Sequence, residues 1–255
     1  MAELIKSSKV VLYLSGLTCT DENFMQKAGA QREAAELGLA LVSPDTSPRG
    51  VDVPGAGDDW DFGFGAGFYL NATREPYSKN FHMYDYITKE LPEVLRSLHE
   101  LDMDRVSLMG HSMGGHGVLT IGLKNPTAYK SVSAFSAICN PSQVPWGQKG
   151  EAVLRQGACT SLSGYLGEDK EQWRQYDATL LAEAYSGPSS LPILMDTGTD
   201  DDFLKVQLHP WAFEKAIEGK VQLTSRMQEG YDHSYFFIST FVADHLQFHA
   251  KHLHA

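Results

Sequence analysis

Three features are scarce in this chain, and each scarcity excludes a class of protein. Cysteine occurs only at Cys19, Cys139 and Cys159, an odd and widely spaced set that indicates free thiols in a reducing compartment rather than a disulfide framework. The 21 basic residues are outnumbered by 32 acidic ones, and the net charge of −11 argues against a nucleic-acid or anionic-membrane partner. No apolar run reaches the roughly 20 residues of a membrane-spanning helix, and the N-terminal stretch lacks the features of a signal peptide. We therefore expect a cytoplasmic protein that binds neither nucleic acid nor membranes.

The apolar residues that are present form short runs separated by helix-like segments. Strands that alternate with helices of this length predict an α/β fold, a mostly parallel sheet with helices on both faces, within a single domain over residues 1–255. The apolar runs show little polar alternation, as burial on both faces of a sheet requires. The predicted strands are 10–14, 39–42, 106–109, 132–136, 193–195 and 221–227, and the predicted helices are 22–37, 84–99, 114–124, 204–218 and 235–253.

Two long stretches interrupt this alternation. Residues 44–79 are rich in glycine, proline and aromatic residues, and we expect an ordered loop that packs near a functional site. Residues 140–172 form the second irregular region, at a position where a cap-like insertion commonly follows a strand.

The sequence Gly110-His111-Ser112-Met113-Gly114 has the G-x-S-x-G pattern of a nucleophile elbow. The bare pattern occurs by chance in roughly one chain in ten, given ordinary glycine usage. Here it lies between a predicted strand and a predicted helix, which is the context that exposes a serine hydroxyl above a sheet. Ser112 is therefore a candidate nucleophile.

A serine nucleophile needs a histidine base and an acid that orients the histidine, in the chain order Ser, Asp or Glu, His for this elbow. Asp200, Asp201 and Asp202 follow the predicted strand 193–195, and His233 follows the predicted strand 221–227. Both loops lie at carboxyl ends of strands, where open α/β sheets place their sites. The residues alone do not separate the three aspartates, each of which could instead cap a helix.

The other histidines fit a base less well. His111 flanks the nucleophile and is expected to point away from it, and His116 lies in the following helix. His245, His249 and His252 share one helix face, which we interpret as a solvated face rather than a metal site.

An oxyanion hole needs two N–H donors. The backbone N–H of Met113 follows the nucleophile, and Leu17 lies in the loop after the first strand, where esterases of this kind place the second donor.

Motifs along nearly the whole chain resemble the S-formylglutathione hydrolase family, also called esterase D. They are SGLTCT, SPDTSPRG, DFGFGAGFY, GHSMGGHGVLTIGLKNP, YKSVSAFSAICNP, PWG, SGYLG, YDAT and RMQEGYDHSYFFI. The resemblance implies an α/β-hydrolase fold and a cytosolic serine thioesterase that hydrolyses S-formylglutathione to glutathione and formate. It also implies cleavage of simple carboxylesters, frequent homodimers, and neither a cofactor nor a metal.

Carried over by motif, the resemblance makes Ser112 the nucleophile, His233 the base and Asp201 the acid. It assigns the oxyanion donors to Leu17 and Met113. Cys19 matches a cysteine near the family's site; its alternative role is that of a small buried residue. Trp60 and Trp146 are candidates for crowding the pocket around the small formyl group, and Arg49 is a candidate for contact with a carboxylate of glutathione.

The chain departs from the family pattern in two places. Family members carry roughly thirty-five further residues before the SGLTCT strand, so we expect N-terminal edge strands to be missing and an exposed sheet edge that lowers stability. About a dozen extra residues, 150–162, separate PWG from SGYLG. The alternatives to the thioesterase are a broad-specificity carboxylesterase or acyltransferase of the same fold, and a form with little or no activity.

Overall fold

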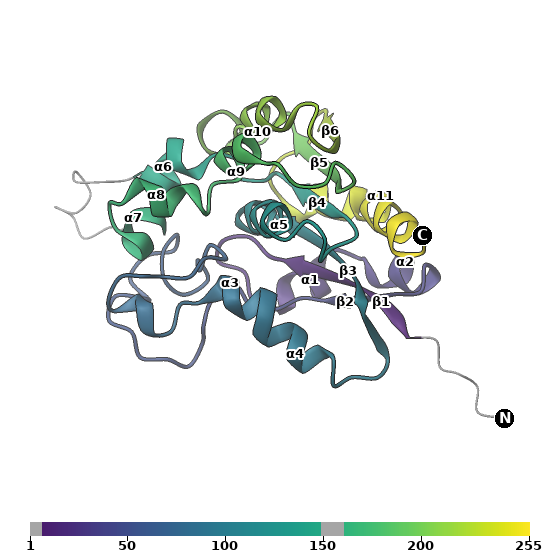
Figure 1. Cartoon of the computed structure of the whole chain (residues 1–255), viewed down its shortest axis with the longest axis horizontal. Helices are drawn as coiled ribbons and strands as arrows, with labels where there is room; N and C mark the ends of the chain where they lie inside the picture. Colours follow the sequence, from purple (N-terminus) through teal and green to yellow (C-terminus); the bar gives the residue numbers. More distant parts are fainter. Residues whose placement is uncertain (1–6, 149–160) are drawn as a thin grey trace.

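The computed structural model describes residues 7–148 and 161–255, and it contains a six-stranded sheet in which all neighbouring strands are parallel (Figure 1). The strand order is β2-β1-β3-β4-β5-β6, so the connections change direction between β1 and β3. The prediction of a parallel sheet is confirmed, and β3 extends beyond its predicted segment at both ends. The strands are β1 (Ser8–Leu14), β2 (Leu39–Val42), β3 (Leu101–His111), β4 (Val132–Phe135), β5 (Pro192–Gly198) and β6 (Gln222–Gln228).

Two of the predicted helices are divided by a backbone turn. Segment 22–37 forms two helices because Gly29, with a φ of 67°, separates them. Segment 204–218 is divided at His209, whose φ is 48°, and Pro210 then begins the next helix. The helices are α1 (Glu22–Lys27), α2 (Gln31–Glu36), α3 (Met83–Asp85), α4 (Leu91–Leu95), α5 (Met113–Lys124), α6 (Pro145–Gln148), α7 (Ser161–Leu166), α8 (Lys170–Arg174), α9 (Ala178–Ala184), α10 (Pro210–Ile217) and α11 (Tyr235–Leu253), with 3₁₀ turns η1 (Tyr77–Lys79) and η3 (Pro141–Gln143) and π turns η2 (Tyr86–Glu90) and η5 (Leu204–Leu208).

Successive residues of β1 point to opposite faces of the sheet, and helices cover both faces. Val10 and Leu12 belong to one apolar cluster, to which α5, α9 and α10 contribute. Val11 and Tyr13 belong to a second cluster on the other face, with side chains from α1, α2 and α11 (Figure 1). All four side chains are buried. Burial on both faces accounts for the continuous apolar runs of the strands.

The loop 44–79 packs against the carboxyl end of β1. Phe68 and Tyr69 are buried, and the Tyr69 hydroxyl donates to the carbonyl oxygen of Ser15 at 2.9 Å. The Thr18 N–H donates to the carbonyl oxygen of Gly65, also at 2.9 Å. These bonds hold the loop beside the residues that follow β1.

The region 140–172 contains η3, α6, α7 and α8. The extra segment 150–162 lies almost entirely outside the described residues. Within the described ranges, no helix has both the length and the apolar character required to span a membrane.

Candidate active site

Ser112 lies at the tight turn between β3 and α5, next to the point where the strand connections change direction. Its backbone has φ 57° and ψ −115°, a conformation that a residue with a side chain rarely adopts. Such strain persists only where the surrounding structure enforces it, and it is typical of a nucleophile elbow. The serine is nearly buried, with 3% of its surface exposed.

The two glycines of the motif permit this turn by close backbone contact. A Cβ atom on Gly114 would lie 1.9 Å from the carbonyl oxygen of Leu14, at the end of β1. A Cβ atom on Gly110 would lie 2.4 Å from the carbonyl oxygen of Gly114. Because neither contact is possible for a real side chain, the spacing of the motif follows from the packing of the elbow on β1.

Asp201 and His233 contact each other across the loops that follow β5 and β6. The His233 Nδ1 atom lies 2.6 Å from Asp201 Oδ2, and the other carboxylate oxygen accepts a bond of 2.9 Å from the N–H of Phe203. Asp201 is buried, whereas 20% of the His233 side chain is exposed. Of the three adjacent aspartates, Asp201 is therefore the one positioned to orient the histidine. With Nδ1 protonated, Nε2 is free to accept a proton.

The side chain of His111 lies toward His233, contrary to the expectation that it points away from the site. Its ring centroid is 4.5 Å from that of His233. Burial and the neighbouring His233 lower the pKa of His111 well below its ordinary value. A neutral His111 ring therefore packs against His233 and links it to the elbow, since Ser112 is the next residue.

The candidate oxyanion donors approach the elbow from two sides. Residues Leu14 and Gly110 are paired in the sheet, so the loop after β1 and the elbow leave it at the same level. A Cβ atom on Gly16 would lie only 3.1 Å from the Cβ of Ser112. Among the described residues, neither the N–H of Leu17 nor that of Met113 has a hydrogen-bond acceptor. Both donors are thus available to a ligand beside Ser112.

Aromatic side chains extend from His233 to the surface. The Phe203 ring lies 4.9 Å from the ring of His233 and 4.9 Å from that of Trp146, which in turn lies 6.2 Å from Trp60. Trp146 is buried and Trp60 is 58% exposed. The structure therefore brings both predicted pocket tryptophans into one aromatic row with the histidine. Phe203, which the sequence analysis did not single out, joins them to it.

Comparison with known proteins supports the same chemistry. Residues 5–248 match the family model described as "Putative esterase". The chain is 51% identical to the S-formylglutathione hydrolase of Rattus norvegicus and 52% identical to that of Arabidopsis thaliana, over 95% and 96% of this chain and 83% of each relative. The chain belongs to the S-formylglutathione hydrolase family. A solved S-formylglutathione hydrolase from Agrobacterium tumefaciens superposes with a TM-score of 0.88 at 50% identity, covering 97% of this chain and 85% of that one. The predicted α/β-hydrolase fold and family resemblance are confirmed.

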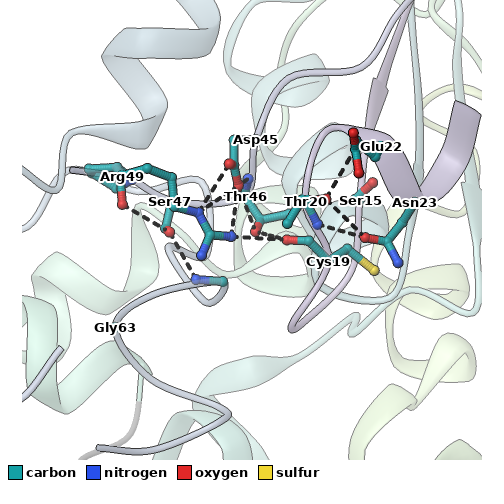
Figure 2. A network of polar contacts seen from close by, with 12 residues as sticks. Ser15, Cys19, Thr20, Glu22, Asn23, Asp45, Thr46, Ser47, Arg49 and Gly63 are labelled. Atoms are coloured by element: carbon teal, nitrogen blue, oxygen red, sulfur yellow. Dashed lines mark hydrogen bonds and ion pairs between the residues drawn. The ribbon is translucent and has the colours of Figure 1, made fainter. Parts of the chain in front are cut away.

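In this member of the S-formylglutathione hydrolase family, the loop after β1 is tied to the loop after β2 (Figure 2). The carbonyl oxygen of Cys19 accepts bonds from the Thr46 hydroxyl and from Arg49 Nη2, the latter at 3.3 Å. The guanidinium of Arg49 also forms an ion pair of 2.9 Å with Asp45. Burial raises the pKa of the Cys19 thiol. The Cys19 backbone, rather than its thiol, is thus the group that connects the two loops.

A buried polar network under α11 replaces the solvated face predicted for its histidines. His249 lies 2.7 Å from the hydroxyls of Ser131 and Ser133, and its burial lowers its pKa well below the ordinary value. His245 stacks on Phe135 at 3.7 Å and lies 3.5 Å from Asp196. Both histidines are fully buried, so the prediction of a solvated face is wrong for them. The described residues contain no group of three potential metal ligands.

Asp196 also joins the two strands that lead to Asp201 and His233. Its two carboxylate oxygens each accept a bond of 2.6 Å from Arg226 on β6. Burial alone would raise the pKa of Asp196, but the nearby ring of His245 and the bonds from Arg226 hold it below its ordinary value. The ion pair fixes β5 against β6 just before both loops begin. The sequence analysis missed it because the partners are thirty residues apart.

Proposed function

We propose that this protein is a serine thioesterase that hydrolyses S-formylglutathione to glutathione and formate. The observation that carries the proposal is the strained turn at Ser112, whose neighbour His111 packs its ring 4.5 Å from a histidine held at 2.6 Å by a buried carboxylate. The family relationship supports the choice of substrate, because the relatives at about half identity bear the name of that activity.

The reaction begins at Ser112. Its Oγ attacks the formyl carbon while Nε2 of His233 takes the hydroxyl proton. Asp201 holds the imidazole in the required tautomer and stabilises the imidazolium that forms. The negative charge on the tetrahedral oxygen is stabilised by the N–H groups of Leu17 and Met113.

Collapse of this intermediate breaks the carbon–sulfur bond and leaves a formyl ester on Ser112. The departing glutathione thiolate needs little help, since the pKa of an ordinary thiol is about 8.5, and it takes the proton from His233. A water molecule then attacks the ester while His233 accepts its proton and returns one to the serine oxygen. Formate is released and the free enzyme is restored.

Labelling with a fluorophosphonate probe tests the nucleophile. We expect one adduct, on Ser112, that disappears in Ser112→Ala and persists in Ser97→Ala, an exposed serine far from the elbow in sequence. An adduct that survives Ser112→Ala would refute the assignment.

Steady-state kinetics test the substrate class. We expect kcat/KM for S-formylglutathione to exceed that for 4-nitrophenyl acetate by at least 100-fold. Comparable values would favour the second candidate, a broad carboxylesterase, and absence of both activities in a folded protein would favour the inactive form.

The organisation and location of the protein form part of the proposal. We infer a single α/β domain, because helices from both halves of the chain cover the same sheet. A cytoplasmic location is supported by Cys19 and Cys139, which are free. We also propose a homodimer, which size-exclusion chromatography with light scattering would test.

A further inference from the structure

A charged cavity lies outside the triad, between the loop after β2 and the segment from η1 to η2. Its volume is 520 Å³, which is within the range of small-molecule sites. It is lined by residues of the loop after β2 and by the segment from η1 to η2, including Asp45, Arg49, Lys79, Asn80 and Glu90. No step of the proposed hydrolysis uses these side chains.

The cavity adjoins the loop that carries the oxyanion donor Leu17. Arg49, on its wall, donates to the carbonyl oxygen of Cys19 (Figure 2). Two residues of extended chain span at most about 7 Å. With the bond of 3.3 Å to Cys19, the guanidinium therefore lies no farther than roughly 10 Å from the backbone of Leu17. An extended tripeptide has a similar length, at about 3.3–3.6 Å per residue. A peptide thioester held at Ser112 can therefore reach the cavity with its far end.

The charges around the cavity are of both signs. Nε and Nη2 of Arg49 bond to Asp45 and Cys19, whereas Nη1 has no partner among the described residues. Lys79 and Glu90 are exposed, and neither forms an ion pair within the described part of the chain. The cavity thus offers two cationic donors and one free carboxylate. That set matches a carboxylate and an ammonium group on the same carbon atom.

We propose that this cavity binds the γ-glutamyl end of the glutathione portion of the substrate. The α-carboxylate lies between Arg49 and Lys79, and the α-ammonium faces Glu90. This inference rests on the proposed function, and it makes Lys79 a residue that determines substrate preference. Simple esters, which lack the peptide, do not use the cavity.

Charge reversal at Lys79 tests the proposal, with Lys130→Glu as the matched control. Lys130 is also exposed, but it precedes β4 and so lies at the amino ends of the strands, opposite to the carboxyl ends that carry the elbow. We expect Lys79→Gln to raise KM for S-formylglutathione about threefold, because it removes an exposed ion pair. Lys79→Glu should raise it about tenfold, because the new carboxylate also repels the carboxylate of the ligand. The values of kcat, and of kcat/KM for 4-nitrophenyl acetate, should stay within twofold of wild type. Lys130→Glu should leave both substrates unchanged.

Equilibrium binding separates this inference from the proposed activity. Calorimetry with S-methylglutathione, which cannot be hydrolysed, should show about tenfold weaker binding to Lys79→Glu. Truncation of the ligand to S-methyl-cysteinylglycine should abolish the difference between the variant and wild type. If wild type does not hydrolyse S-formylglutathione but these binding results hold, the thioesterase proposal fails and the cavity assignment stands. Equal binding by wild type and Lys79→Glu, or an equal loss on ester and thioester, would overturn the cavity assignment.

Discussion

Acid should destabilise this protein through His116, a histidine sealed inside α5. Its side chain is fully buried, and its backbone N–H donates to the carbonyl oxygen of Ser112 at 2.9 Å. Burial lowers its pKa from 6.5 to about 4. The unfolded chain therefore binds a proton at a higher pH than the folded protein does. The contribution of neutral His116 to the free energy of unfolding is therefore full above about pH 6.5 and decreases as the pH falls toward 4.

The size of the loss follows from the two pKa values. Each unit of difference corresponds to 1.36 kcal/mol, so His116 alone removes about 1 kcal/mol of unfolding free energy at pH 6, about 2 at pH 5 and about 3 at pH 4. The free energy of unfolding of a folded protein is usually 5–15 kcal/mol, so the loss through His116 at pH 4 is a large fraction of it. The lowered pKa values of His111, His245 and His249 act in the same direction.

Urea denaturation between pH 8 and pH 4 measures this effect in wild type and His116→Gln, which has a side chain of similar size that does not titrate. The substitution lowers stability by some constant amount, but the decrease between pH 8 and pH 4 should be smaller by about 3 kcal/mol. His99→Gln, at an exposed position, is the control and should keep the wild-type pH dependence. An unchanged pH dependence in His116→Gln would refute the reasoning.

Five substitutions address the site and the ion pair between β5 and β6. Asp201→Asn should lower kcat by about 10⁴-fold, because the amide favours the wrong tautomer of the base, while Asp202→Asn should change kcat less than threefold. Gly114→Ala places a Cβ 1.9 Å from a carbonyl oxygen, so we expect kcat/KM to fall at least 100-fold or soluble protein to be lost. Trp60→Ala should raise kcat/KM for 4-nitrophenyl butyrate relative to acetate about tenfold without a change in melting temperature, since its ring is largely exposed. Asp196→Asn should lower the free energy of unfolding in urea by about 3 kcal/mol, because it removes the charge of a fully buried carboxylate that pairs with Arg226.

The sheet and the elbow were predictable because their signals are local. Each strand is a short apolar run, and the spacing of Gly110, Ser112 and Gly114 reflects contacts that only glycine permits. The acid was not predictable from the residues alone, because three adjacent aspartates have the same chemistry. Only the folded turn, in which the N–H of Phe203 bonds to Asp201, determines which carboxylate faces the histidine.

The histidine stripe of α11 shows why a helical pattern alone misleads. The helical spacing correctly places His245 and His249 on one face of α11. A polar helix face is exposed, however, only if the sheet that the helix packs against presents no polar groups to it. Here β4 and the residue before it present serine hydroxyls, and β5 presents Asp196, so the polar face packs inward. Buried polar groups with such partners fix the position of a helix more narrowly than apolar contacts do. Because α11 begins two residues after His233, the network under the helix also holds the loop that presents the catalytic base.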